Sequence, residues 1–201
     1  MIDEKVPEYY LFENFIDKEY ASFLAKFFLE NMHEDRREFY GFYPIQSKNY
    51  FFTEDTLVPL PYDPERAINK AVEFAHDFFL KTYKMLGEFE LHRSHGNLMF
   101  KKAKLHVHKD DHISYESLED DLPSRTYVMG IFLNDDYEGG EITFPNSNKA
   151  LKPPTGSLLL FPGFRSEHGV NEITSGVRIN ILVDFFDITD PDNVIEEYKI
   201  P

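Results

Sequence analysis

Val177-Arg178-Ile179-Asn180-Ile181-Leu182-Val183 is the stretch that most directly indicates how this chain folds. It is apolar throughout except at Arg178 and Asn180, which share one face because alternate residues of a strand point the same way. A run of this kind is typical of a strand that is covered on both sides. The C-terminal part of the chain is therefore predicted to be a β-rich core with an arginine inside it.

Seven further strand-like runs lie after residue 88, so eight short strands are expected in all. Turn signals separate them, among them Gly139-Gly140, Pro153-Pro154 and Pro162-Gly163. The predicted strands cover residues 89–93, 97–108, 126–134, 141–144, 149–152, 156–161, 166–170 and 177–186. This succession of short strands favours a sandwich or a jelly-roll barrel.

Before residue 88 the apolar spacing is that of helices. One expected helix follows Asp17 as its N-cap, and a second follows Asp63, with Pro64 in its first turn and Gly87 at its end. Helices followed by strands predict an α+β fold. We expect a single domain over residues 1–201, in which a mainly helical support region, 1–88, packs on one sheet of a jelly-roll core, 89–201, that carries a metal site.

Composition and charge disfavour several classes of protein. The 201 residues are 42% hydrophobic and 16% aromatic, which is enough for one full core and too aromatic for a disordered chain. The net charge of −15 disfavours general binding to nucleic acid or to an anionic membrane, because such a surface repels phosphate groups. No secretory signal and no apolar run of the roughly 18–20 residues that span a bilayer is present, so we expect a cytoplasmic protein.

The chain contains no cysteine, so any metal site must use histidine and carboxylate side chains. His108 and Asp110 lie two apart on an expected strand and can present an imidazole and a carboxylate to one point. His168, the only histidine after residue 112, is the candidate third ligand. Two imidazoles and one carboxylate on one face of a metal are typical of non-haem iron(II) oxygenases. The His-x-Asp pair alone is better explained as two solvated polar residues at the end of a strand.

Arg178 needs an anionic partner if its strand is buried, because an unpaired buried charge is costly. A guanidinium pairs bidentately with a carboxylate, so a bound dicarboxylic acid would satisfy it. An internal salt bridge to one of the 36 acidic residues would satisfy it as well. The arginine by itself leaves both interpretations open.

Several motifs stand in a fixed order along the C-terminal half. They are His108-x-Asp110, Phe132-Leu133-Asn134-Asp135-Asp136-Tyr137-Glu138-Gly139-Gly140-Glu141, Pro154-x-Gly156-Ser157-Leu158-Leu159-Leu160-Phe161, and His168-Gly169-Val170 followed by Gly176-x-Arg178. Together they resemble the prolyl 4-hydroxylase-like branch of the iron(II)/2-oxoglutarate-dependent dioxygenases, whose fold is a double-stranded β-helix, or jelly roll. The resemblance covers most of the chain and is tightest over 105–184, and residues 10–19 look like the N-terminal strand and helix of the family.

The resemblance implies roles for individual residues. His108, Asp110 and His168 would be the catalytic iron(II) ligands, and Arg178 would hold the distal carboxylate of 2-oxoglutarate. Dioxygen would be the second co-substrate, with ascorbate as a candidate auxiliary reductant. The implied activity is hydroxylation of a peptidyl substrate, prolyl residues among them, or of a small molecule, with release of succinate and CO2.

Two tyrosines that contact the co-substrate in relatives are replaced here. Phe132 stands at one position, and Leu98 and Met99 stand at the other. We expect Asn180 or Tyr127 to supply the missing polar contacts to 2-oxoglutarate.

Two alternative functions use the same barrel. One is a cupin-like metal enzyme without the co-substrate, which Arg178 at this spacing disfavours. The other is a non-enzymatic jelly-roll module, which has no physical need for the complete set of three metal ligands and an arginine.

Overall fold

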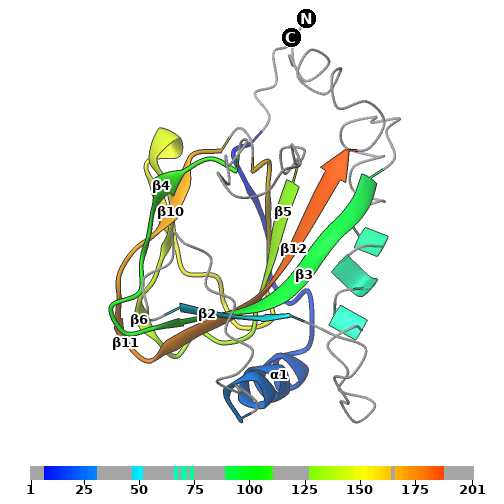
Figure 1. Ribbon diagram of the computed structural model, residues 1–201, viewed down its shortest axis with the longest axis vertical. Coiled ribbons are helices and arrows are strands. Elements are labelled where there is room, and N and C mark those ends of the chain that lie inside the picture. The colour runs from blue at the N-terminus through cyan, green and yellow to red at the C-terminus, as the bar shows by residue number, and fades with distance from the viewer. Residues whose placement is uncertain are drawn as a thin grey trace, which may run out of the picture.

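The strands build two large antiparallel sheets around one interior (Figure 1). The computed structural model describes residues 7–30, 47–51, 66–67, 69–71, 73–74, 89–110, 127–163 and 166–187. The six-stranded sheet has the order β1-β9-β5-β12-β3-β2. Its strands are β1 (Tyr10–Phe12), β2 (Ser47–Phe51), β3 (Phe89–Phe100), β5 (Tyr127–Phe132), β9 (Leu158–Phe161) and β12 (Val177–Asp187).

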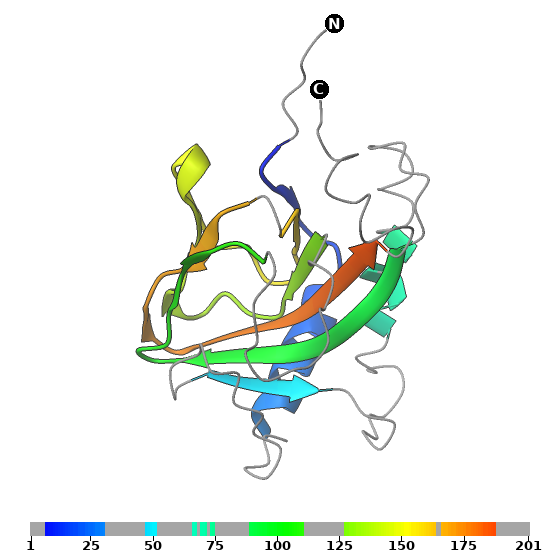
Figure 2. The same ribbon diagram turned by 45° about the horizontal axis from the view of Figure 1, so that its top comes forward.

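The four-stranded sheet has the order β4-β10-β7-β8 and lies across the interior from the larger sheet (Figure 2). Its strands are β4 (Leu105–His108), β10 (His168–Val170), β7 (Ile142–Phe144) and β8 (Lys149–Leu151). A short 3-10 turn, η2 (Pro145–Ser147), joins β7 to β8, and a small third sheet pairs β6 (Glu138–Gly139) with β11 (Ile173–Ser175). Aromatic and aliphatic side chains of both large sheets fill the space between them, among them Phe132, Phe144 and Phe161.

The six-stranded sheet is covered on both faces, as the apolar pattern of β12 predicts. Along β5, Met129 and Ile131 belong to a cluster with the N-terminal helix, whereas Val128 and Phe132 belong to the interior cluster. This alternation follows from the two-residue repeat of a strand. It places Arg178 and Asn180 on the interior side of β12, because Asn180 is paired with Phe132 on β5.

Helix α1 (Lys18–Glu30) begins at Asp17, as predicted. The Asp17 carboxylate accepts hydrogen bonds from the backbone N–H groups of Glu19 (2.8 Å) and Tyr20 (3.2 Å), which satisfies two donors that a helix start leaves free. The buried face of α1 packs in one cluster with residues of the six-stranded sheet, and a Cβ atom on Gly96 would lie 2.9 Å from the Phe28 ring.

The second expected helix is described only in part. Residues 66–67, 69–71 and 73–74 are helical, and Ala67 and Ala71 are fully buried in the cluster that contains α1. The predicted start and end of this helix, at Asp63, Pro64 and Gly87, lie outside the described residues. Within the described part of the chain, no helix combines the length and apolarity needed to cross a membrane.

The predicted break between residues 93 and 97 is wrong, since β3 continues from Phe89 to Phe100. The chain turns instead at Lys101 and Lys102. Lys102 adopts a left-handed backbone (φ 73°), and its N–H donates to the Ile173 carbonyl at 2.8 Å. A lysine rarely marks such a turn, because positive φ is ordinarily taken by glycine or asparagine. The short strands β6 and β11 were also not predicted.

Candidate metal centre

Two histidines face each other across neighbouring strands of the four-stranded sheet. β4 and β10 pair antiparallel, and His108 lies directly opposite His168 in the register. Directly opposed side chains project from the same face of a sheet. The centroids of the two imidazole rings are accordingly 4.4 Å apart, although 60 residues of sequence separate them.

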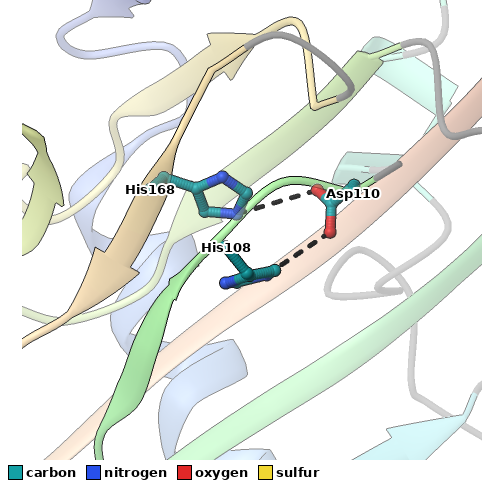
Figure 3. Close-up of side chains that lie close together, drawn as sticks. All are labelled: His108, Asp110 and His168. Carbon is teal, nitrogen blue, oxygen red and sulfur yellow. Dashed lines mark ion pairs between the residues drawn. The ribbon is translucent and has the colours of Figure 1, made fainter. Parts of the chain in front are cut away.

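Asp110 completes the group from the segment that follows β4 (Figure 3). One carboxylate oxygen lies 3.5 Å from His108 Nε2, and the other lies 3.7 Å from His168 Nε2. The Asp110 N–H donates to the Gly163 carbonyl at 2.9 Å, which anchors this residue to the chain just after β9. Only 5% of Asp110 is exposed, so its charge is held away from solvent.

Hydrogen bonds to backbone carbonyls orient both imidazoles. His108 Nδ1 lies 2.9 Å from the His106 carbonyl, and His168 Nδ1 lies 2.9 Å from the Ser166 carbonyl. A carbonyl can only accept, so each Nδ1 carries the hydrogen and donates it. In the neutral tautomer, each Nε2 then presents its lone pair to the space beside Asp110, as is usual for histidines that bind a metal.

The three side chains fit a divalent transition-metal ion. Their candidate ligand atoms all lie within 4.8 Å of one another. Nitrogen and oxygen ligands bind such ions at about 2.0–2.2 Å, so ligands that share one face of a six-coordinate ion lie about 3 Å apart. Across the described ranges, this is the one group of three histidine or acidic side chains close enough to share an ion. Two nitrogens and one carboxylate oxygen are the ligand set of non-haem iron(II) sites.

Arg178 lies on the interior side of the six-stranded sheet, in a buried polar group. Only 4% of the arginine and 1% of Asn180 are exposed. Arg178 Nη1 donates to Asn180 Oδ1 at 3.2 Å and lies 3.3 Å from Met99 Sδ. The guanidinium carbon lies 5.0 Å from the centroid of the Phe132 ring, a distance typical of a cation–π contact.

Aromatic side chains connect this polar group to the histidine pair. Phe132, beneath Arg178, belongs to the same interior cluster as Phe144 and Phe161. The Phe161 ring centroid lies 4.5 Å from that of His168. The three predicted metal ligands and Arg178 therefore border one apolar interior.

Tyr127 is not brought to this interior. Its side chain belongs to the cluster on the opposite face of β5, with Met129, Ile131 and the buried face of α1. Asn180, the other predicted contact to the co-substrate, does lie beside Arg178. Sequence reasoning missed Tyr137, which is 1% exposed and contacts the same interior cluster as Met99. A large aromatic residue within the polar turn Asn134-Asp135-Asp136 was a signal that could have identified it.

Gly163 offers a way to disturb the site without changing a predicted ligand. A Cβ atom there would lie 2.8 Å from Asp110 Oδ2 and 3.0 Å from Asp110 Cβ. We expect Gly163→Ala to displace the carboxylate and to weaken metal binding about 10- to 100-fold, the usual effect of a lost supporting contact. Calorimetric titration with Mn(II) measures this loss, and an unchanged circular dichroism spectrum separates it from unfolding. Unaltered metal affinity would show that metal binding does not depend on the present position of the Asp110 carboxylate.

Comparison with known proteins shows what this part of the chain is similar to. Residues 94–185 match the 2OG-Fe(II) oxygenase superfamily, a segment that includes all three members of the metal-ligand cluster and Arg178. Among sequence relatives, a PKHD-type hydroxylase from Prochlorococcus marinus (strain MIT 9515) is 25% identical over 100 residues, which are 49% of this chain and 45% of the relative. The chain thus spans less than half the length of the curated relatives that it matches.

Solved structures of prolyl hydroxylases share the fold. The viral collagen prolyl hydroxylase of Paramecium Bursaria Chlorella virus-1 superposes with a TM-score of 0.66 at 14% identity, over 90% of this chain and 96% of that one. A prolyl-4-hydroxylase from Pseudomonas putida superposes with the same TM-score at 16% identity, over 92% and 95% of the two chains. The mainly antiparallel architecture with few helices is therefore the fold of these solved prolyl hydroxylases.

Proposed function

We propose that this chain is an iron(II)- and 2-oxoglutarate-dependent hydroxylase. The observation that carries the proposal is the placement of a His108–Asp110–His168 cluster and a buried Arg178 around one apolar interior. A metal chelate alone would not require a buried guanidinium, whereas a co-substrate with a second carboxylate does. The superfamily match of residues 94–185 supports the same conclusion.

Iron(II), 2-oxoglutarate and dioxygen, when bound, supply the oxidising chemistry that hydroxylates a substrate and yields succinate and CO2. His108, Asp110 and His168 would hold the ion from one side only, so that three positions remain for other ligands. Their orientation is set by the carbonyls of His106 and Ser166.

The other residues of the interior would bind the co-substrate and shield the reacting centre from water. Arg178 would bind the distal carboxylate, and Asn180, which accepts a hydrogen bond from the guanidinium, would hold that guanidinium in place. Phe161 and Phe144 pack beside His168 and exclude water from the reacting centre.

A peptidyl substrate, with proline as the first candidate residue, agrees with the names of the relatives. The Prochlorococcus relative is called a PKHD-type hydroxylase and the viral one a collagen prolyl hydroxylase. We also propose that residues 1–201 act as one domain, in which both N-terminal helices cover the outer face of the six-stranded sheet. The buried contacts of α1, Ala67 and Ala71 with that sheet support this arrangement.

Succinate formation tests the proposed activity directly. We expect the iron-loaded chain to convert 2-oxoglutarate to succinate in the presence of O2, slowly without a substrate and faster when a proline-rich peptide is added. Succinate is quantified by mass spectrometry, with anaerobic and metal-free samples as controls. If succinate forms at the same rate in the metal-free control, or does not form at all, the proposed function is wrong.

A further inference from the structure

Tyr137 is held rigidly beside the buried arginine. Tyr137 lies in the polar turn before β6, and only 1% of it is exposed. A Cβ atom on Gly140 would lie 3.2 Å from the ring, and one on Gly176 would lie 3.2 Å from Tyr137 Cβ, so both glycines permit close approach. Lys152 Nζ lies over the ring, 4.7 Å from its centroid, in a cation–π contact, and it also donates to the Tyr137 carbonyl. The ring consequently has little freedom to turn away.

The Tyr137 hydroxyl is buried, and its own O–H group has no acceptor among the described residues. The Arg178 guanidinium interacts with the hydroxyl oxygen but can only donate to it. Tyr137 packs against Met99, whose sulfur lies 3.3 Å from Arg178 Nη1, so the phenol and the guanidinium are neighbours. Burial raises the pKa of Tyr137 above its usual value of 10.0, and the nearby Arg178 only partly offsets this. The hydroxyl therefore keeps its proton at neutral pH and can donate a hydrogen bond.

Asn180, which also contacts the arginine, has a second buried donor of this kind. Its Oδ1 accepts from Arg178, while its Nδ2 group is buried and has no partner within the described ranges. Buried donors in folded proteins are nearly always paired, so two unpaired donors around one cation indicate that a bound group completes them. A carboxylate accepts about four hydrogen bonds, and its charge is opposite to that of the guanidinium beside these donors.

Phe132, which contacts the guanidinium, cannot donate a hydrogen bond to a bound carboxylate, so another side chain has to do so. Its ring lies under the guanidinium at 5.0 Å and offers no donor. On the basis of the proposed function, we infer that the Tyr137 hydroxyl donates a hydrogen bond to the distal carboxylate of 2-oxoglutarate, beside Arg178, and that Asn180 Nδ2 supplies a second one. Tyr137 is thus a specificity residue for a five-carbon dicarboxylic 2-oxo acid, supplied by a turn and not by the sheet.

The test is Tyr137→Phe, which removes the hydroxyl and keeps the packed ring. Binding is measured by calorimetric titration of the Mn(II)-loaded chain without O2, using 2-oxoglutarate and 2-oxobutanoate, which has the same chelating end but no distal carboxylate. We expect 2-oxoglutarate to bind about 10- to 100-fold more weakly, as for the loss of one hydrogen bond to a charged group. The affinity for 2-oxobutanoate should change less than twofold.

A second readout separates binding from a structural role. Because the variant removes a buried hydroxyl whose O–H group lacks an acceptor in the described part of the chain, the melting temperature of the ligand-free chain should stay the same or rise. Tyr20→Phe makes the same chemical change in α1, on the outer side of the six-stranded sheet, and should leave both affinities unchanged.

Two results would overturn the inference. One is 2-oxoglutarate affinity within twofold of the unaltered chain, which leaves the proposed function intact. The other is an equal loss for both acids together with a lower melting temperature, which would show that the hydroxyl supports the fold. If the unaltered chain itself binds no 2-oxoglutarate, the proposed function fails first and the inference fails with it.

Discussion

Replacing His168 with alanine is expected to reduce bound iron from about one ion per chain to nearly none. The residue is one of the three candidate metal ligands, and its Nδ1 is already hydrogen-bonded to the Ser166 carbonyl. Asp110 and His108 alone would form a two-ligand site, which should lower the affinity by more than about 100-fold, since even supporting residues change it 10- to 100-fold. Iron content is measured after anaerobic loading and desalting, and succinate formation should disappear with it.

His106→Ala is the matched control for that variant. His106 lies on β4, two residues before His108, and is exposed. Its backbone carbonyl, which the substitution keeps, accepts the hydrogen bond from the ring of His108. Iron content of His106→Ala should equal that of the unaltered chain. If both His168→Ala and His108→Ala also retained full iron content, the metal would have to bind elsewhere.

Replacing Arg178 with methionine is expected to abolish tight binding of 2-oxoglutarate. Methionine keeps much of the side-chain volume but removes every donor, and the guanidinium that it replaces is 4% exposed. Truncating one partner of a buried charge pair costs about 2–5 kcal/mol, which corresponds to roughly 30- to 5,000-fold in affinity. The measurement is a titration of the anaerobic iron complex with 2-oxoglutarate, followed by its visible absorption.

Arg178→Lys separates charge from geometry at the same position. Lysine retains the positive charge but lacks the planar fork, so its affinity should fall between those of arginine and methionine. Iron binding without co-substrate should change little in either variant, because neither touches the three ligands. A midpoint for Arg178→Met within about twofold of the unaltered chain would favour an internal salt bridge as the reason for this arginine.

The local part of the site could be predicted because strand alternation is a local rule. His108 and Asp110 were expected to converge because they lie two residues apart, and the structure places both beside His168. Arg178 and Asn180 were expected to share a buried face of one strand, and both are buried on the interior side of β12. Asp17 likewise caps α1, because capping depends on residues two and three positions away.

The contacts made by isolated tyrosines were not predictable in the same way. Tyr127 and Phe132 lie on one strand, five residues apart, and therefore on opposite faces, so that only Phe132 reaches the interior. Tyr137 lies in a turn, where no period relates a side chain to a face. Its direction depends on close approach by Gly140 and Gly176, which are separated by 36 residues of sequence.

The amino-acid sequence by itself determined the residue types of the candidate metal site, the mainly β character of the C-terminal region and the buried arginine, since each depends on composition or on a short period. Tertiary structure alone decided that His168 lies opposite His108, that β3 continues to Phe100, and that Tyr137 rather than Tyr127 lies beside Arg178. Strand register and turn direction decide such pairings, and both are set by packing between segments far apart in the chain.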